Sequence, residues 1–309
     1  MQSSSRRAFL TGRRAAQNPW EAFCRRMRRA VSGSFFDFGL EDGLGSARLT
    51  PKEMADVHRA RALCVEYGVL LALDGVPHAT RSFHQPVLWV DPGRDMAGCK
   101  RLSEGGSRWF VQPGCMLGEL EANGLKQFSG LPYHLTVAAW LADRCSGDWD
   151  SGATAESGLE HASVLFGDGG AVSLGPFGAS DRTPLDSLSL QRLVSSLFEM
   201  AGQPEAQACR REKRWPARYR LDALLPAPEH TVNLSHLLLG HGGDLGWVQW
   251  VVLDERPAAE GSGGARDLPF AAGRHDNDSE TWLLAADLDA RVKALFDPSG
   301  VFPHPGQDL

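Results

Sequence analysis

Residues 233–257 read NLSHLLLGHGGDLGWVQWVVLDERP, and this stretch decides how the rest of the chain is interpreted. Its loop is rich in glycine: Gly240, Gly242, Gly243 and Gly246. Glycines allow the backbone to adopt positive φ and to approach a ligand or another segment closely. Residues 247–253 (WVQWVVL) then form a continuous apolar run, which is typical of a core strand. The stretch therefore predicts a tight loop that leads into a buried strand.

The composition is that of an ordinary globular protein. The chain has 309 residues, of which 42% are hydrophobic and 23% charged, enough for one large domain or two modest ones. It contains no run of about 18 apolar residues, so no transmembrane segment is predicted. Its six cysteines show neither a CxxC motif nor a zinc-like Cys/His cluster. This predicts reduced thiols, a cytoplasmic location and no metal site.

Charge is distributed unevenly along the chain. Residues 1–30 contain eight arginines and one glutamate, a net charge of +7. The whole chain carries −6, so the remainder carries −13. A basic arm on an acidic body could fold back on that body, bind an acidic partner, or make peripheral contact with anionic lipid. No nucleic-acid partner is predicted.

The first residues contain a motif that resembles an export signal. Residues 5–10 (SRRAFL) resemble the twin-arginine signal S-R-R-x-F-L. Such a signal requires an apolar segment next, but residues 11–29 (TGRRAAQNPWEAFCRRMRR) are basic and polar. We interpret the motif, Ser5 to Leu10, as a relic or a coincidence, with export as the alternative, and we keep the prediction of a cytoplasmic protein.

A helix is predicted to begin at Asn18, because Asn18 is a good N-cap and Pro19 is favoured at the first helical position. Apolar residues then fall on one stripe: Trp20, Phe23, Cys24, Met27 and Val31. Such a helix could dock on the body or lie on a membrane surface. Residues 33–46 are rich in glycine and are predicted to form a linker. Residues 1–48 are therefore interpreted as a basic N-terminal arm with one amphipathic helix.

From residue 49 onward the pattern alternates between helices and strands. Helices are predicted at residues 50–67, 116–123, 189–201 and 282–296. Strands are predicted at residues 69–73, 87–90, 109–114 with their turn, 247–253, and in a hairpin at 163–174. Residues 203–218 are interpreted as a polar surface excursion. We predict a domain at 49–257 with subdomains at about 49–108 and 109–257, a flexible linker at 258–281, and a C-terminal helix and tail at 282–309.

Six short motifs occur in an order that is characteristic of one protein family. They are residues 110–114 (FVQPG), 136–147 (TVAAWLADRCSG), 164–169 (VLFGDG), 218–225 (RYRLDALL), 239–246 (LGHGGDLG) and 293–306 (KALFDPSGVFPHPG). In this order and spacing they resemble the FAD-binding domain of the vanillyl-alcohol oxidase type, also called the PCMH-type or FAD-linked oxidase family. Within that family the chain looks most like the D-2-hydroxyacid (D-lactate) dehydrogenase-like branch.

The resemblance implies an α+β fold of two α/β subdomains with FAD held non-covalently between them. It also implies flavin-dependent oxidoreductase chemistry, with electrons passed to a redox partner subunit. Adenosine would lie toward Val164, the pyrophosphate near residues 75–81 and 138–139, and the flavin ring toward residues 240–246. The residues implied to bind FAD are Gly75, Val76, Pro77, His78, Ala79, Thr80, Thr136, Ala138, Ala139, Ser146, Gly147, Val164, Gly240, Gly243 and Gly246. No catalytic residue can be named from the match.

The chain departs from the family's pattern at ligand-facing positions. The family's R-G-G-G-T-S loop is replaced by residues 74–82 (DGVPHATRS), where Asp74 adds a negative charge and Pro77 removes an N–H donor. Further replacements are Ala138-Ala139 for a Gly-Gly pair and His241-Gly242 for Ser-Glu. Only about 24 residues are available where the family carries its cap domain, so a fold without a cap domain is predicted.

Two functional interpretations follow. The chain could be a FAD-binding oxidoreductase-type module, or a non-catalytic pseudo-oxidase that has lost FAD and binds a protein partner through its basic helix. Single side chains leave alternatives open too. His78 could attach flavin covalently, His241 could face the flavin and Arg81 could neutralise a pyrophosphate, or all three could be ordinary loop residues. Residues 275–278 (HDND) are interpreted as a polar loop without a metal.

Overall fold

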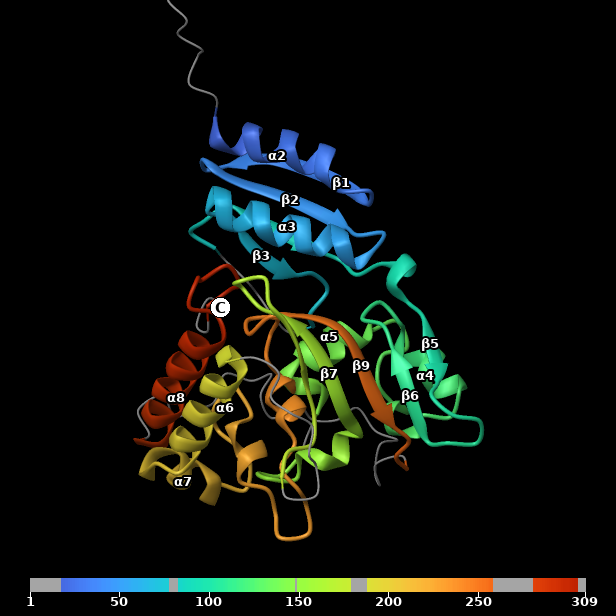
Figure 1. Ribbon diagram of the computed structural model, residues 1–309, viewed down its shortest axis with the longest axis vertical. Coiled ribbons are helices and arrows are strands. Elements are labelled where there is room, and N and C mark those ends of the chain that lie inside the picture. The colour runs from blue at the N-terminus through green and yellow to red at the C-terminus, as the bar shows by residue number, and fades with distance from the viewer. Residues whose placement is uncertain (1–17, 78–82, 148, 179–187, 258–279, 305–309) are drawn as a thin grey trace, which may run out of the picture.

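The computed structural model describes residues 18–77, 83–147, 149–178, 188–257 and 280–304. Within them the chain forms an α+β fold with two separate sheets, one of four strands and one of five. Figure 1 shows the smaller sheet with α2 and α3 at one end of the molecule and the larger sheet with α6, α7 and α8 at the other. The α+β class confirms what the sequence predicted.

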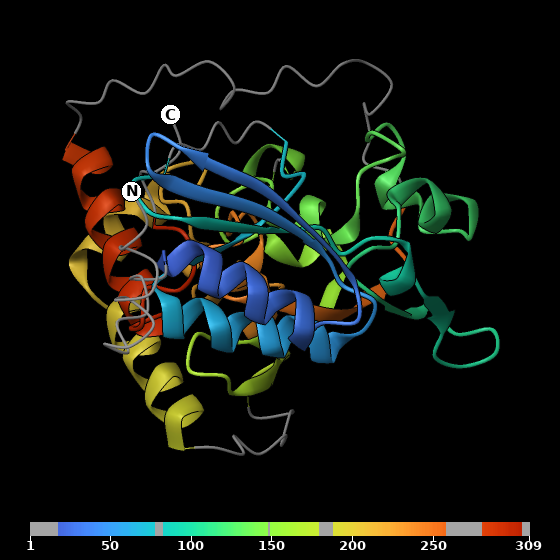
Figure 2. The same cartoon turned by 90° about the horizontal axis from the view of Figure 1, so that it is seen from above.

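The smaller sheet has the strand order β1-β2-β4-β3. Its strands are β1 (Ser34–Glu41), β2 (Leu44–Thr50), β3 (Leu70–Leu73) and β4 (Val87–Val90). β1 and β2 are antiparallel, whereas β4 runs parallel to both β2 and β3. Two helices, α2 (Pro19–Ala30) and α3 (Met54–Tyr67), share a buried apolar cluster with one face of this sheet. Figure 2 shows α2 and α3 side by side against the strands.

Helix α2 begins where the sequence predicted. The Asn18 side chain accepts a hydrogen bond from the Trp20 N–H and so caps the helix. Phe23 and Met27 are fully buried in the apolar cluster, and the Trp20 indole N–H donates to Asp37 at 3.1 Å. Of the two interpretations of this helix, docking on the body is confirmed, because its apolar stripe is already covered.

The prediction of a linker at residues 33–46 is wrong, because β1 and the first three residues of β2 lie there. Strand β1 pairs with β2 from Ser34 opposite Thr50 to Glu41 opposite Leu44. The turn is Asp42-Gly43, with φ of 49° and 83°, which is the Asp-Gly pair that two-residue hairpins favour. The helix predicted from residue 50 begins later, at Met54, since Thr50 is the last residue of β2.

The larger sheet has the strand order β5-β6-β9-β7-β8 and is antiparallel throughout. Its strands are β5 (Cys99–Arg101), β6 (Arg108–Val111), β7 (Leu159–Leu165), β8 (Ala171–Leu174) and β9 (Trp247–Asp254). Strand β9 is the central strand, which confirms the buried strand predicted at residues 247–253. The hairpin predicted at residues 163–174 is confirmed as the β7–β8 pair.

The remaining helices share a second apolar core with the larger sheet. They are α4 (Leu117–Ala122), α5 (Val137–Ala142), α6 (Leu188–Ala201), α7 (Pro204–Arg211) and α8 (Glu280–Phe296). The surface excursion predicted at residues 203–218 is wrong: α7 lies there, and Cys209, Trp215 and Ala217 are buried. Charged residues outnumber the buried apolar residues within 203–218, so the sequence pattern indicated a polar surface segment. None of the described helices is long and apolar enough to cross a membrane.

Polar and apolar contacts join the two sheets. Arg61 of α3 donates to the Gly167 carbonyl at 2.8 Å, and His58 of α3 lies 2.8 Å from the Gln249 amide of β9. The cluster beneath the smaller sheet also includes Trp247 from β9. The domain boundaries drawn from the sequence stay predictions, and most of the linker at 258–281 lies outside the described residues.

Candidate functional site

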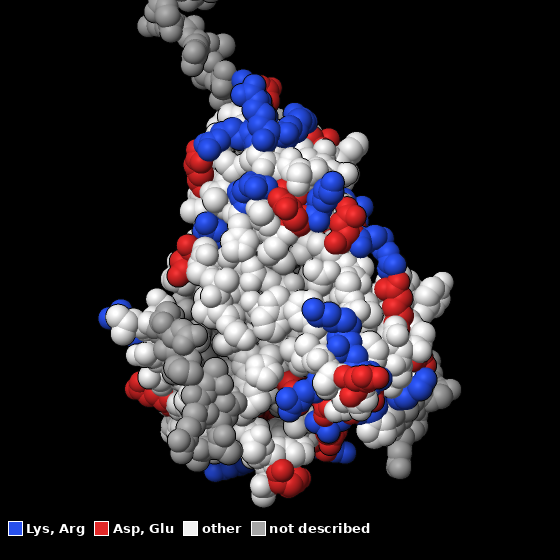
Figure 3. Space-filling view, turned by 45° about the vertical axis from the view of Figure 1, so that its right-hand side comes forward, with Lys and Arg blue, Asp and Glu red and all other residues white. Residues whose placement is uncertain are grey.

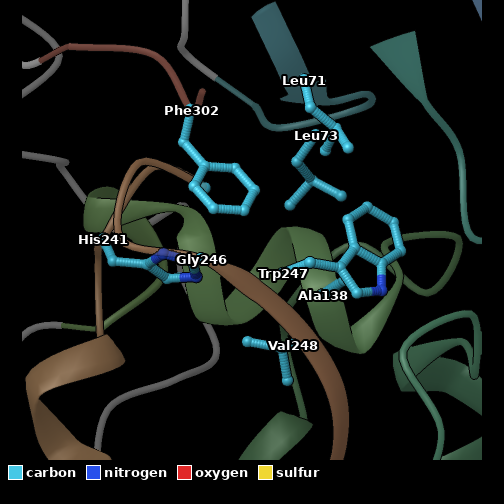
Figure 4. A pocket seen from close by; sticks show the side chains of 9 residues that line it. Leu71, Leu73, Ala138, His241, Gly246, Trp247, Val248 and Phe302 are labelled. Atoms are coloured by element: carbon cyan, nitrogen blue, oxygen red, sulfur yellow. The ribbon is translucent and has the colours of Figure 1, made fainter. Parts of the chain in front are cut away.

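The structure brings together several of the segments that were predicted to bind FAD. The end of β3, the start of α5, the glycine loop before β9 and the C-terminal segment meet between the two sheets (Figure 4). The cavity they enclose is lined by Leu71, Leu73, Ala138, His241, Gly243, Gly246, Trp247, Val248 and Phe302. In Figure 4 the rings of His241 and Phe302 lie on one side and that of Trp247 on the other, with the Leu73 side chain between the Phe302 and Trp247 rings.

This cavity is very small. The space left for a water-sized sphere is about 10 Å³. A single buried water needs about 10–15 Å³ on this measure, so the cavity has room for one water at most. Its lining is almost entirely apolar, and only His241 and the Trp247 indole offer polar side-chain atoms.

Gly243 is close to protein atoms rather than to an open site. It has φ of +81°, and a Cβ built on it would lie 2.9 Å from the Leu73 Cβ, closer than side chains pack. The glycine is therefore required by the approach of β3 to the loop. Leu73 lies on the wall of the cavity where the motifs imply the flavin ring.

Three other predicted cofactor glycines repeat this pattern. A Cβ on Gly246 would lie 2.6 Å from a methyl group of Val164, which is itself a predicted adenosine contact. A Cβ on Gly147 would lie 2.0 Å from the Trp149 ring. A Cβ on Gly240, where φ is +76°, would lie 3.2 Å from the backbone of Arg144. In each case the space that a side chain would occupy at the glycine is taken by other atoms of the protein.

Backbone amides that a phosphate nest would present to its ligand are used internally. The Gly240 N–H donates to the Leu141 carbonyl at 2.7 Å, and the Ala138 N–H to the Pro113 carbonyl at 3.0 Å. The Ala139 N–H donates to the Thr136 hydroxyl, which caps α5 at 3.2 Å. Since anion binding in such loops depends on free N–H groups, these amides are not available to a pyrophosphate.

The predicted pyrophosphate loop begins on the other side of Leu73. Gly75 and Val76 line an open recess of about 440 Å³ together with Phe38, Arg48, Leu73, Asp74 and Trp89. The Gly75 N–H donates to the Asp74 carboxylate at 2.8 Å, and Arg48 forms an ion pair with Asp74 at 2.6 Å. The charge of Arg48 is thus already balanced. His78, Ala79, Thr80 and Arg81 lie outside the described residues.

The buried ammonium group of Lys293, near the cavity, also has all its hydrogen-bond acceptors within the protein. Lys293 is 2% exposed and donates to the Asp244 carbonyl at 2.7 Å, to Asp297 at 2.6 Å and to the Phe302 carbonyl at 3.2 Å. Burial lowers the pKa of Lys293, and the Asp297 carboxylate opposes that shift. All three ammonium hydrogens have acceptors, so Lys293 ties the glycine loop to the C-terminal segment and leaves no donor for a phosphate.

The other predicted residues lie away from the cavity or on its wall. The Ser146 hydroxyl donates to Asp143 at 2.5 Å, beside Gly147. His241 is 1% exposed and lies on the cavity wall, as Figure 4 shows. Among the residues missed from the sequence, Trp247 has a buried indole N–H without a hydrogen-bond partner in the described part of the chain. The Lys293 and Asp297 pair could have been found from its i, i+4 spacing in an apolar helix.

The described residues therefore do not fit FAD at the position that the motifs imply. A pyrophosphate needs free N–H donors and uncompensated positive charge, whereas the amides and cations described above are occupied. The isoalloxazine needs a slot between the sheets, where the side chains of Leu73, Trp247 and Phe302 lie. Within the described ranges no group of three or more His, Cys, Asp or Glu could hold a metal ion. Residues 275–278 are outside those ranges.

Comparison with known proteins gives similarity of fold only. No protein-family model matches the chain, and no curated protein matches it in sequence. Two structures of alkyldihydroxyacetonephosphate synthase align with TM-scores of 0.41 and 0.40 and identities of 14% and 15%, covering 69% of this chain and 32% and 33% of theirs. A variant of Physcomitrella patens BBE-like 1 aligns with a TM-score of 0.46 and 12% identity, covering 76% of this chain and 44% of its own.

The chain spans less than half the length of each of these structures. Similarity this low concerns part of the fold and supports no statement about function. The finer assignment to the D-2-hydroxyacid dehydrogenase-like branch has no support from a sequence or family match and stays a prediction.

Proposed function

We propose that this chain is a non-catalytic protein-interaction subunit that has lost FAD while keeping a fold of the FAD-linked oxidase type. The observation that carries this proposal is the contact of Leu73 with Gly243, which closes the space between the sheets to about 10 Å³. The internally bonded amides of Gly240 and Ala138 support it independently, because they remain unavailable even if Leu73 moves.

The surface proposed to bind a partner is the exposed side of α2. This side carries Arg25, Arg26, Arg28 and Arg29. Figure 3 shows Lys and Arg side chains gathered at the α2 end of the molecule, above a broad face with few charged residues. Arg28 pairs with Asp37 at 3.1 Å, and both stay partly exposed. Such a surface fits an acidic protein partner better than a bilayer, because the apolar stripe of α2 is buried.

Flavin content tests the first half of the proposal. The protein is purified under native conditions, and flavin is sought by visible absorption of the eluting peak and by fluorescence after heat extraction. We expect a colourless protein that takes up no added FAD in a fluorescence titration. A flavin band that co-elutes with the protein would overturn the proposal and favour the redox module. In that case Gly243→Val should abolish flavin uptake.

Charge reversal tests the second half. We expect Arg25→Glu/Arg29→Glu to abolish cross-linking between α2 and an acidic partner in the producing cell, with the cross-linked peptides identified by mass spectrometry. The matched control is Arg211→Glu/Lys213→Glu, which reverses two exposed charges at and just after the end of α7. Equal loss in both variants, or no loss in either, would contradict a role for the arginine face.

A further inference from the structure

The outer edge of β1 is an unprotected strand edge. β1 is the terminal strand of the smaller sheet, and β2 is its only neighbour among the described strands. Figure 2 looks down on this hairpin, which lies on the outside of the molecule. Natural edge strands usually carry lysine, proline or a covering element, because a bare edge pairs with other chains. The β1 sequence SFFDFGLE contains neither lysine nor proline.

Large apolar side chains extend along this edge. Phe36 is 63% exposed, Phe38 56% and Leu40 50%. The rings of Phe36 and Phe38 contact each other with centroids 5.1 Å apart, so they form one patch. Phe38 also lines the open recess of about 440 Å³ beside Trp89, which extends the patch across the sheet. A bulge between Asp37 and Gly39 bends the strand, which is one device that natural edge strands use, but it leaves Phe36 and Phe38 exposed.

The charges at the two ends of β1 are opposite in sign. The strand begins beside the C-terminal end of α2, where Arg29 is exposed. Arg28 lies there over the Phe35 ring and is ion-paired with Asp37 at 3.1 Å. The strand ends in the exposed acidic pair Glu41 and Asp42. In an antiparallel pair of two β1 strands, the acidic end of each strand would lie beside the basic end of the other. The edge is therefore complementary to itself under a twofold axis.

We propose that two copies of this chain associate through antiparallel pairing of their β1 strands. The second copy supplies the missing strand neighbour, and the Phe36, Phe38 and Leu40 side chains of the two copies pack together. The four-stranded sheet becomes a continuous sheet of two copies. This association does not depend on flavin content. It shares Arg28 and Arg29 with the arginine face of α2, so the variant that separates it from the proposed function is Phe36→Lys/Phe38→Lys, which leaves those arginines in place.

The mass of the protein in solution tests this association. Sedimentation equilibrium or light scattering over a concentration series should show a dimer that dissociates on dilution. Phe36→Lys/Phe38→Lys should give a monomer, because it places two charges in the patch. The matched control Val65→Lys changes a residue of α3 that is 49% exposed and should leave the dimer intact. A monomer at every concentration, or a dimer unchanged by Phe36→Lys/Phe38→Lys, would overturn the proposal.

Charge exchange tests the antiparallel arrangement. Glu41→Lys/Asp42→Lys and Arg28→Glu/Arg29→Glu should each weaken dimerisation by about tenfold, as expected for a few rim ion pairs. Combining the four substitutions should restore it. A combined variant that dimerises no more tightly than either double variant would exclude antiparallel pairing of β1.

Hydrogen exchange identifies what covers the edge. The β1 amides should be protected in a concentration-dependent way, and protection should be lost in Phe36→Lys/Phe38→Lys. Concentration-independent protection that disappears when residues 1–17 are deleted would mean that the chain's own N-terminal segment covers the edge. That result would overturn the dimer.

Discussion

Apolar side chains are buried between the two sheets but exposed along the outer edge of β1. Between the sheets, Leu73, Trp247 and Phe302 are buried together and leave about 10 Å³. On β1, Phe36 and Phe38 are more than half exposed, beside a recess of about 440 Å³. The first region contains the glycine-loop motif and is filled by protein side chains, whereas the second is open and includes only the start of the predicted pyrophosphate loop, Gly75 and Val76. The two regions therefore differ in how much of their apolar surface the protein itself covers.

The largest expected effect is at the buried ion pair that fastens the closed region. Asp297→Asn would leave the Lys293 ammonium buried without its counter-charge, and such changes cost about 3–5 kcal/mol of unfolding free energy. The double variant Lys293→Met/Asp297→Asn should recover part of that loss, since no unpaired charge remains. Urea unfolding followed by circular dichroism measures both. A double variant less stable than Asp297→Asn would mean that the Lys293 hydrogen bonds to Asp244 and Phe302 matter more than its charge.

A smaller effect is expected at Gly243, where the glycine loop approaches Leu73. Gly243→Ala combines the strain of φ at +81° with a contact at 2.9 Å to Leu73, a loss of about 2–4 kcal/mol. The matched control is Gly75→Ala, which has φ of +75° and no atom within 4 Å of the new Cβ. It should lose only about 1–2 kcal/mol, the strain alone. Equal losses in urea unfolding would show that Leu73 does not press on Gly243.

The sequence identifies elements whose cause is local. The N-cap at Asn18, the central strand β9 and the β7–β8 hairpin follow from a capping residue, an apolar run and a turn. The β1–β2 hairpin was locally encoded too, by Asp42-Gly43 between two alternating segments. It was missed because the many glycines of residues 33–46 were interpreted as a linker.

Whether the candidate site is open or filled by side chains cannot be predicted from the local sequence pattern. Gly243 is compatible with a close ligand or with a close side chain, and only the fold shows that Leu73 is the neighbour. The replacements at Asp74 and Ala138 were interpreted as unfavourable for a pyrophosphate, and in the structure the N–H groups of Gly75 and Ala138 donate to protein acceptors. Which amides are occupied depends on partners far away in the chain, such as Pro113 for Ala138.

A third effect concerns His236, which is buried beside Leu159 at the start of β7. His236 is 3% exposed, its Nε2 lies 2.7 Å from the Leu159 carbonyl, and burial lowers its pKa from 6.5 to about 4. Below pH 6.5 His236 becomes protonated in the unfolded chain but stays neutral in the folded chain until the pH approaches 4. The unfolding free energy therefore falls as the pH drops from 6.5 toward 4. The loss between pH 7 and pH 5 is about 2 kcal/mol from this residue.

The measurement compares two histidine variants at both pH values. His236→Gln should reduce the loss of stability between pH 7 and pH 5 by about 2 kcal/mol, whereas His134→Gln, at an exposed histidine, should not change it. Comparing the change in unfolding free energy between pH 7 and pH 5, rather than its absolute value, removes the pH-independent effect of the substitution on stability. An unchanged slope in His236→Gln would show that water reaches this histidine in the folded protein.

The smallest effect is expected at the open edge. Phe38→Thr keeps a residue that favours strands and removes a ring that is 56% exposed, so the stability of the monomer should change within about 0.5 kcal/mol. The unfolding free energy must be measured at a protein concentration low enough for the monomer to dominate. At higher concentrations Phe38→Thr should lower the apparent stability relative to the unaltered chain, because only the unaltered β1 strand gains from pairing. A loss above about 1 kcal/mol at low concentration would mean that Phe38 is covered within one copy, and the contrast between the two regions would then be wrong.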